Sequence, residues 1–222
     1  MKESRPKPKL PEGFIVTIDG TAASGKGTTA AMVAKHLGLV HIDSGSIYRA
    51  VALLALEREI AAEQEQEIVD LLAHVTPELL VDERIRSDKV SAHSSNIAKI
   101  MLLRAGVKGR SREMVQSHAP GAVVEGRDSA TVFPQAHAKF FITASPEARA
   151  TRRHKQSIQR GEGKAFEELL EAIKKRDEQD TTRTIDPLVV PEDALHIDNT
   201  HLSREEVFDL VVDHIYKKHG SN

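Results

Sequence analysis

Cysteine is absent from the 222 residues, which excludes disulfide bonds and thiol catalysis and is compatible with a reducing cytoplasm. No stretch of about 18 apolar residues occurs, so we expect no membrane-spanning helix. The opening residues lack the apolar stretch of a secretory signal and combine charges with three prolines. We therefore expect a cytoplasmic protein with a disordered tail over residues 1–12 and a single folded domain over 13–222.

Several functional signatures are missing as well. The 11 histidines form no H-E-x-x-H motif, and we find neither a G-x-S-x-G nucleophile motif nor an evident acid–base pair. We accordingly expect no metal site built from side chains. The N-K-x-D and D-x-x-G motifs of regulatory GTPases are absent, which disfavours a switch protein. A net charge of −2 also argues against binding of nucleic acid by the chain as a whole.

The segment GTAASGKGTT, residues 20–29, nearly matches the phosphate-binding pattern G-x-x-x-x-G-K-[ST]. The hydroxyl arrives one position late, because Gly27 separates Lys26 from Thr28. A β-branched apolar run at 13–19 precedes the loop, and a helical pattern follows it. In that context backbone N–H groups bind phosphate, and Lys26 would reach the β- and γ-phosphates of a nucleotide. The alternative is an ordinary glycine-rich turn.

Short apolar strands alternate with helical patterns along the chain, which predicts an α/β fold with a parallel sheet covered on both faces. Beyond the first strand and helix, strands are expected at 39–43, 121–128, 138–143 and 194–198. Further helices are expected at 46–59, 63–75, 91–117, 146–160 and 165–180. Residues 75–91 would suit either a small hairpin or a helix with a loop. A last helix opens with a capping box, Ser203 with Glu206. Its expected apolar stripe is Val207, Leu210, Val211 and Ile215.

Three further stretches are rich in charged residues. DSGSIYRA at 43–50 and EGRDSATVFP at 125–134 follow expected strands and so reach the carboxyl edge of the sheet, where ligands bind in such folds. In KRDEQDTTR at 175–183, Arg176, Asp180 and Arg183 have the spacing of one helix face. Each stretch also has a plainer explanation, namely a helix cap, an internal ion pair and a solvated face, respectively.

Phosphoryl transfer to a phosphate oxygen needs cations rather than a general base, because that oxygen is already ionised at neutral pH. The sequence supplies Lys26 in the loop and a run over 149–183 with ten Lys or Arg against seven Asp or Glu. Many of these cations are arginines, which suit phosphate better than lysine does. A solvated helical surface would also explain the run.

Together these stretches resemble the bacterial cytidylate kinases, members of the nucleoside monophosphate kinase group. That group often spells its loop G-x-x-x-x-G-K-G-T, and DSGSIYR, EGRD and RDEQDTTR…PL follow in the family's order, so the resemblance covers nearly the whole chain. It implies a monomeric P-loop kinase of three layers that transfers the γ-phosphoryl group of ATP to CMP or dCMP, with Mg²⁺ carried on ATP. It also implies a nucleotide-binding insert at about 60–105 and a lid at about 150–183.

The resemblance further implies which residues bind the two nucleotides. ATP would be bound by Gly20, Thr21, Ala22, Ala23, Ser24, Gly25, Lys26, Gly27 and Thr28. The residues expected to act in the transfer itself are Lys26, Arg127 and Arg183. The phosphate of CMP would be held by Arg49, Arg127 and Arg183, its base by Ser95, Arg104 and Asp128, and its ribose by Arg176 and Asp180. Asp43 and Ser44 complete the expected substrate-binding set.

The chain departs from the family pattern at Thr21, where proline is usual, at Ala22, where some members have serine, and over 129–134, which is one residue shorter. Two other functions are open. One is a P-loop kinase for another small molecule, of the shikimate or dephospho-coenzyme A type. The other is a nucleotide-binding regulatory or RNA-associated protein without turnover, which the arginines on three separate segments disfavour.

Overall fold

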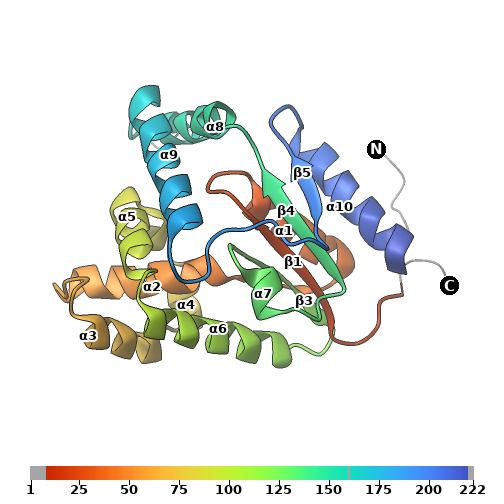
Figure 1. Cartoon of the computed structure of the whole chain (residues 1–222), viewed down its shortest axis with the longest axis horizontal. Coiled ribbons are helices and arrows are strands. Elements are labelled where there is room, and N and C mark those ends of the chain that lie inside the picture. The colour runs from red at the N-terminus through yellow and green to blue at the C-terminus, as the bar shows by residue number, and fades with distance from the viewer. Residues whose placement is uncertain (1–8, 160, 220–222) are drawn as a thin grey trace. The chain divides into compact units, whose positions relative to one another are not determined.

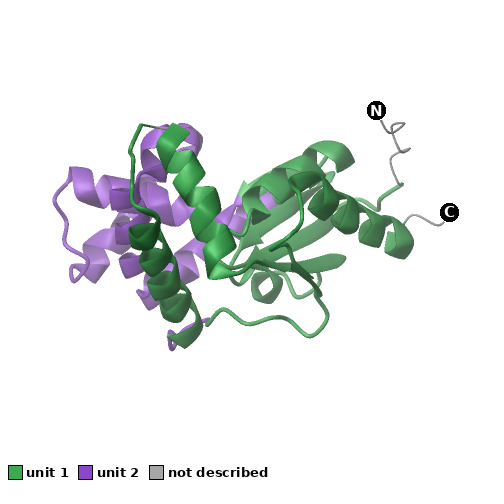
Figure 2. Cartoon of the chain, turned by 90° about the horizontal axis from the view of Figure 1, so that it is seen from above, with its two compact units in different colours: residues 1–42, 118–182, 187–222 green, residues 43–117, 183–186 purple. Residues whose placement is uncertain are grey.

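The computed structural model describes residues 9–159 and 161–219, and eight of the twelve expected tail residues lie outside this range. The chain forms two compact units (Figure 2). Unit 1 contains the described residues of 1–42, 118–182 and 187–222, and unit 2 contains 43–117 and 183–186. The chain therefore enters unit 2 twice, the second time for only four residues. The expected single domain, insert and lid stay predictions.

Unit 1 is built on a five-stranded sheet with the order β2-β3-β1-β4-β5 (Figure 1). Its strands are β1 (Phe14–Gly20), β2 (Val40–Asp43), β3 (Gly121–Gly126), β4 (Ala138–Thr143) and β5 (Leu195–Asp198). β1 pairs in parallel with both β3 and β4, and β5 pairs in parallel with β4. The predicted α/β fold with a central parallel sheet is thus confirmed.

One face of the sheet is covered by α1 (Lys26–Leu37) and α10 (Arg204–His219). Alternate residues of β1, such as Val16, point to this face and are completely buried. They form one hydrophobic core with Val33 of α1 and Val211 of α10. This core fixes the axis of α1 against the sheet, and so it places the loop from which α1 begins.

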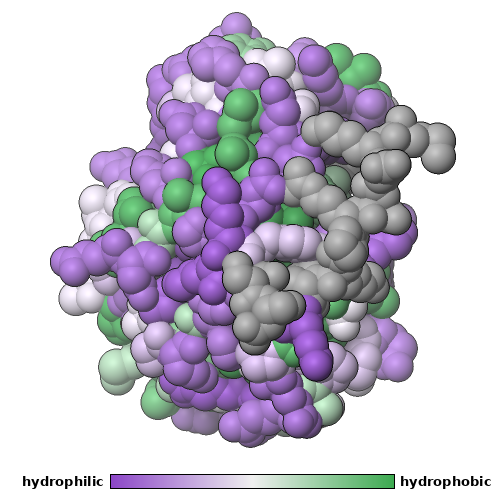
Figure 3. All heavy atoms as spheres, turned by 90° about the vertical axis from the view of Figure 1, so that its right-hand side faces the viewer, coloured by the Kyte–Doolittle hydropathy of each residue, from purple (hydrophilic) through white to green (hydrophobic). Residues whose placement is uncertain are grey.

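The predicted capping box at the start of α10 is confirmed, because Ser203 N donates to Glu206 Oε2 at 2.8 Å and Glu206 N donates to Ser203 Oγ at 3.2 Å. The predicted stripe was wrong at Leu210, which is 44% exposed, while Val212 is buried in its place. The buried side of the helix is therefore turned towards Val212. The surface on the right-hand side of Figure 1 is mainly hydrophilic, with separate apolar patches (Figure 3).

The opposite face of the sheet carries a short helix, α7 (Ser129–Val132), which the sequence did not predict. Asp19 at the end of β1 points to this face, since side chains alternate along a strand. Its carboxylate accepts hydrogen bonds from the backbone N of Ser129 and Ala130, at 2.9 and 2.8 Å. Helices thus lie on both faces of the sheet, as the fold class required.

The remaining helices of unit 1 are α8 (Pro146–Gln159) and α9 (Phe166–Thr182), which pack against each other. Their bounds agree closely with the helices predicted at 146–160 and 165–180. The predicted common face of Arg176, Asp180 and Arg183 was wrong for Arg183, because α9 ends at Thr182.

Unit 2 is helical and has a core of its own, formed by residues such as Ile47, Ile85 and Leu103. Its elements are α2 (Ser44–Glu57), α3 (Glu65–Asp70), η1 (Leu71–His74), α4 (Pro77–Val81), η2 (Glu83–Arg86), α5 (Asp88–Ile97) and α6 (Met101–Gln116). The hairpin considered for 75–91 was wrong, because Thr76, Asp82 and Ser87 each cap a short helical segment. Among the described helices of the chain, none is long and apolar enough to cross a membrane.

Candidate active site

The loop between β1 and α1 has the predicted strand–loop–helix context, since β1 ends at Gly20 and α1 begins at Lys26. Three of its residues, Gly20, Ala23 and Gly25, have left-handed φ values of 147°, 59° and 90°. At Gly20 a side chain is excluded, because a Cβ would lie 1.9 Å from the backbone oxygen of Ile142 on β4. The first glycine of the motif is therefore required by the close approach of two strands.

The carbonyl groups of the loop are held on one side by buried side chains. Arg149 Nη1 donates to the Ala22 oxygen at 3.1 Å, and Asn199 Nδ2 donates to the Ser24 oxygen at 2.6 Å. In a planar trans peptide the C=O and the following N–H point in opposite directions. The N–H groups of Ala23 and Gly25 therefore point away from these side chains, as a loop that binds an anion through its amides requires.

Arg149 also joins the loop to the pair of helices α8 and α9. It is only 2% exposed, and its guanidinium makes a two-pronged contact with the carboxylate of Asp177 on α9. Its Nε donates to the Ala144 oxygen just before α8. A planar guanidinium with fixed donors suits such a junction better than an ammonium group would.

Glu125 of β3 explains why glycine follows Lys26. A Cβ at Gly27 would lie 2.8 Å from Glu125 Oε1 and 3.1 Å from Oε2, so the carboxylate occupies the space of a side chain there. Glu125 is 6% exposed and lies 3.4 Å from His41 Nε2 on β2. The position that carries a hydroxyl in most phosphate loops is thus filled by an acidic oxygen from a neighbouring strand.

Arg127 and Asp180, both predicted to bind substrate, are partners in unit 1. Arg127 Nε donates to Asp180 Oδ2 at 2.8 Å, and both side chains are largely buried. Burial alone would lower the pKa of Arg127, but the carboxylates of Asp180, Glu125 and Asp19 outweigh it and raise the pKa above its ordinary value. Arg127 is therefore a permanent cation near the end of β3, as a phosphate ligand must be.

Asp128 and Arg176 are the other predicted substrate residues of unit 1. Asp128 is the N-cap residue of α7, and its backbone oxygen accepts from the backbone N of Thr131 and Val132 at 3.0 Å each. Arg176 lies on α9, one turn before Asp180. Asp128 is thus positioned by a short helix whose first two backbone N–H groups are bound by Asp19.

Unit 2 begins with the predicted residues Asp43, Ser44 and Arg49. Asp43 caps α2 by accepting from Ser46 N at 3.1 Å, and its other oxygen accepts from Arg49 Nη2. Between them, a Cβ at Gly45 would lie 3.0 Å from Asp43 Oδ1 and 3.1 Å from Arg49 Nη1. This glycine lets the carboxylate and the guanidinium meet over the first turn of α2, which Ser44 opens.

The remaining predicted residues, Ser95, Arg104 and Arg183, also lie in unit 2. Ser95 Oγ donates to the Ser91 oxygen of its own helix at 3.2 Å. Arg104 Nε donates to Asp186 Oδ2 at 2.8 Å, and Arg183 Nε donates to the Asp186 backbone oxygen at 2.6 Å. One acidic residue therefore holds two of the three.

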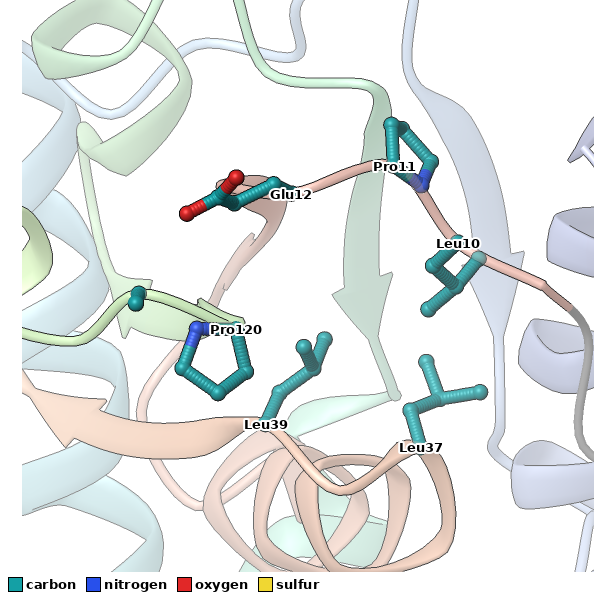
Figure 4. Close-up of a pocket in the computed structure, with 7 residues that line it drawn as sticks. Leu10, Pro11, Glu12, Leu37, Leu39 and Pro120 are labelled. Atoms are coloured by element: carbon teal, nitrogen blue, oxygen red, sulfur yellow. The ribbon is translucent and has the colours of Figure 1, made fainter.

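A cavity of about 410 Å³ lies elsewhere in unit 1 (Figure 4). It is lined by Leu10, Pro11, Glu12, Leu37, Leu39, Ala119 and Pro120. These residues precede β1, β2 and β3 or end α1, so the cavity opens at the amino edge of the parallel strands. The phosphate loop follows β1 and lies at the opposite edge, where ligands bind in such sheets.

Sequence reasoning assigned no role to several residues that shape the predicted site, among them Asp19, Glu125, Asp186 and Asn199. For two of them a signal was present. Asp19 and Glu125 are acids at the carboxyl end of apolar strands, directly before a glycine, and such an acid is costly to bury without a partner. Asp186 and Asn199 lie in irregular segments without a pattern that marks them.

Comparison with known proteins shows to which family the chain belongs. The family model described as cytidylate kinase matches residues 16–217. The chain belongs to the cytidylate kinase family. A cytidylate kinase from Nitrosomonas europaea is 37% identical over 209 residues, covering 89% of this chain and 93% of that one. A cytidylate kinase from Haemophilus ducreyi is 40% identical over 219 residues, covering 92% and 97%. The predicted family resemblance is confirmed.

A solved structure also shares the fold. The crystal structure of an uncharacterized protein from Eubacterium ventriosum aligns with a TM-score of 0.50 at 13% identity, covering 91% of this chain and 98% of that one. At this identity the likeness concerns the fold alone.

Proposed function

We propose that this chain transfers the γ-phosphoryl group of ATP to CMP, giving ADP and CDP, and that it accepts dCMP in the same way. The observation that carries the proposal is the loop over residues 20–28 in a chain of the cytidylate kinase family. Arg149 and Asn199 hold the carbonyl groups of Ala22 and Ser24, so that the amides that follow them are available to an anion. A kinase for another small molecule or a non-catalytic protein is not favoured by the family match.

The proposed chemistry needs no general base. An ionised phosphate oxygen of CMP attacks the γ-phosphorus of ATP, and the bond to the bridging oxygen of ADP breaks. Negative charge then spreads over the transferring group, where fixed cations stabilise it most. We assign this role to Lys26, Arg127 and Arg183. Arg49, which Asp43 orients, would hold the acceptor phosphate with the two arginines.

Base recognition is assigned to Asp128 with Ser95 and Arg104. A carboxylate can accept a hydrogen bond from the exocyclic amine of cytosine, whereas uracil presents a carbonyl oxygen at that position. A site built around such an acceptor disfavours the wrong base, because its polar group is then left unpaired. Arg176 and Asp180 are assigned to the ribose, and the ion pair with Arg127 would keep Asp180 oriented.

Mg²⁺ is proposed to arrive with ATP. Mg²⁺ prefers oxygen ligands and usually binds one or two carboxylates together with phosphates and water. The buried carboxylate of Glu125, which fills the side-chain space at Gly27, fits this preference. The hydroxyl of Thr28, two positions after Lys26, is the other oxygen that the loop sequence offers. These two residues would contact the ion or its waters, and the ion would neutralise phosphate charge during transfer.

A monomer in the cytoplasm would suit an enzyme that acts on free nucleotides.

The decisive variant is Lys26→Ala. We expect ADP formation in the presence of CMP to fall by about 10³-fold or more, because a preorganised cation at the transferring group is lost. Lys35→Ala is the matched control, since Lys35 is an exposed lysine in the last turn of the same helix. Circular dichroism would check that both variants keep the wild-type helix content. Turnover by Lys26→Ala within tenfold of the control would contradict the proposed role of the loop.

A further inference from the structure

Asp186 occupies an unusual place in the chain. It ends the four-residue segment 183–186, which belongs to unit 2 although the residues on both sides belong to unit 1. Its backbone is left-handed, with φ of 48°, a conformation that is uncommon for residues other than glycine and is tolerated best by Asn and Asp. The contacts of Asp186 lie within unit 2.

The carboxylate of Asp186 binds two cations of α6. Its Oδ2 accepts from Arg104 Nε at 2.8 Å and from Lys108 Nζ at 2.6 Å. Arg104 and Lys108 are four residues apart and so lie on one face of the helix. Burial alone would raise the pKa of Asp186, but the hydrogen bonds from Lys108 and Arg104 lower it below the ordinary value. The group is therefore a carboxylate at neutral pH.

Asp186 also fixes the guanidinium of Arg104 rather than merely neutralising it. Arg104 is 3% exposed, and its Nη1 donates to the Ala98 oxygen at 3.2 Å while Nε is held by Asp186. The ring of Tyr48 lies 5.9 Å from its guanidinium carbon, within the range of a cation–π contact. With contacts at two of its nitrogens and over its plane, Arg104 is held in one orientation.

The backbone of Asp186 holds a second arginine. Arg183 Nε donates to the Asp186 oxygen at 2.6 Å, which closes the segment 183–186 on itself. Because the carboxylate binds α6 at the same time, Arg183 is attached to the helix that carries Arg104. A single residue thus connects the two arginines in unit 2.

We propose that Asp186 is a positioning residue for the acceptor nucleotide, acting through Arg104 and Arg183. This inference rests on the proposed function, in which Arg104 contacts the base of CMP and Arg183 its phosphate. Preorganised side chains bind a ligand more tightly because less conformational freedom is lost on binding. Asp186 supplies that preorganisation without touching CMP itself.

Asp186→Asn tests the proposal by the affinity for CMP, measured by calorimetry without ATP. We expect the dissociation constant for CMP to rise about tenfold, the effect of losing a charge-assisted hydrogen bond. The dissociation constant for ATP should change less than about twofold, because the loop over 20–28 is in unit 1. Asp193→Asn is the control, since Asp193 Oδ2 binds Lys139 Nζ at 2.7 Å at an exposed site of unit 1. It should leave both constants unchanged.

A double-mutant cycle separates positioning from a structural role. If Asp186 acts on the base through Arg104, Asp186→Asn combined with Arg104→Lys should weaken CMP binding little more than Arg104→Lys alone. If Asp186→Asn proves too unstable to assay, Asp186→Glu replaces it in the measurement. Because Asp186→Glu keeps the charge, it should retain part of the affinity for CMP. Unchanged CMP affinity with a lowered melting temperature, or fully additive effects in the cycle, would overturn the inference. Failure of the wild-type protein to bind CMP would instead overturn the proposed function, and with it this inference.

Discussion

At Gly27, a residue that is distant in the sequence limits which side chain fits. The sequence shows only that a hydroxyl is displaced by one position in the loop. The structure adds that the missing side chain would meet the buried carboxylate of Glu125 from β3. Any side chain at position 27 would therefore require the carboxylate of Glu125 to move.

This pairing predicts that Gly27→Ala destabilises the protein. The new methyl group must displace the end of the buried Glu125 side chain, and overpacking of this kind costs about 1–3 kcal/mol in the free energy of unfolding, which outweighs the gain of about 0.5–1 kcal/mol from replacing a helical glycine. Gly109→Ala is the matched control, because Gly109 is also helical but has nothing within 4 Å of a Cβ. It should stabilise the protein by about 0.5–1 kcal/mol. Urea unfolding measures both changes, and equal effects of the two substitutions would contradict the account.

Among the elements, α7 depends on a single buried acid. Four residues are too few to show a helical period, so no pattern could reveal this helix. Asp19, which is 1% exposed, binds two of its backbone N–H groups. Burial raises the pKa of Asp19 from 3.8 to about 6, against the lowering effect of these hydrogen bonds.

The raised pKa of Asp19 predicts that the free energy of unfolding depends on pH. Between pH 3.8 and about 6 the folded state holds a proton that the unfolded state has released, so the stability falls as the pH rises through this window. Relative to Asp19→Asn, the wild-type protein should lose up to about 3 kcal/mol between pH 4 and 7, at about 1.4 kcal/mol per pKa unit.

Urea unfolding of both proteins at several pH values measures this difference. For Asp193→Asn the difference should stay nearly constant from pH 4 to 7, because hydrogen bonding to Lys139 lowers the pKa of Asp193 below 3.8 and so moves its titration below this range. A constant difference between wild type and Asp19→Asn from pH 4 to 7 would show that Asp19 does not titrate in this window.

For the whole molecule, the sequence predicted what depends on local pattern. The strand–loop–helix of residues 13–37 was recognised because β-branched and apolar runs, glycines and a helical period are local signals. The contacts that shape the site are not local. Arg104 meets Asp186 across 82 positions, and Asp19 meets Ala130 across 111. Neither contact can be predicted from the residues of a single stretch of sequence.

The division into two units was likewise invisible as a pattern. Unit 2 begins at Asp43, within a stretch that was interpreted as a candidate ligand site and the start of a helix, and it includes four residues that follow α9. Of the predicted substrate residues, Arg127, Asp128, Arg176 and Asp180 lie in unit 1 and the others in unit 2. The candidate site residues could thus be predicted from sequence motifs, whereas the residues that contact them were identified only in the structure.

The central claim is that CMP is the acceptor, and a panel of acceptors tests it most directly. ADP formation from ATP and Mg²⁺ would be measured with CMP, dCMP, UMP, AMP and shikimate, each compared with water alone. We predict the highest rate with CMP, clear turnover of dCMP, slower turnover of UMP, and no increase over water with shikimate. An equal or faster rate with shikimate or AMP, or no increase with any acceptor, would contradict the account.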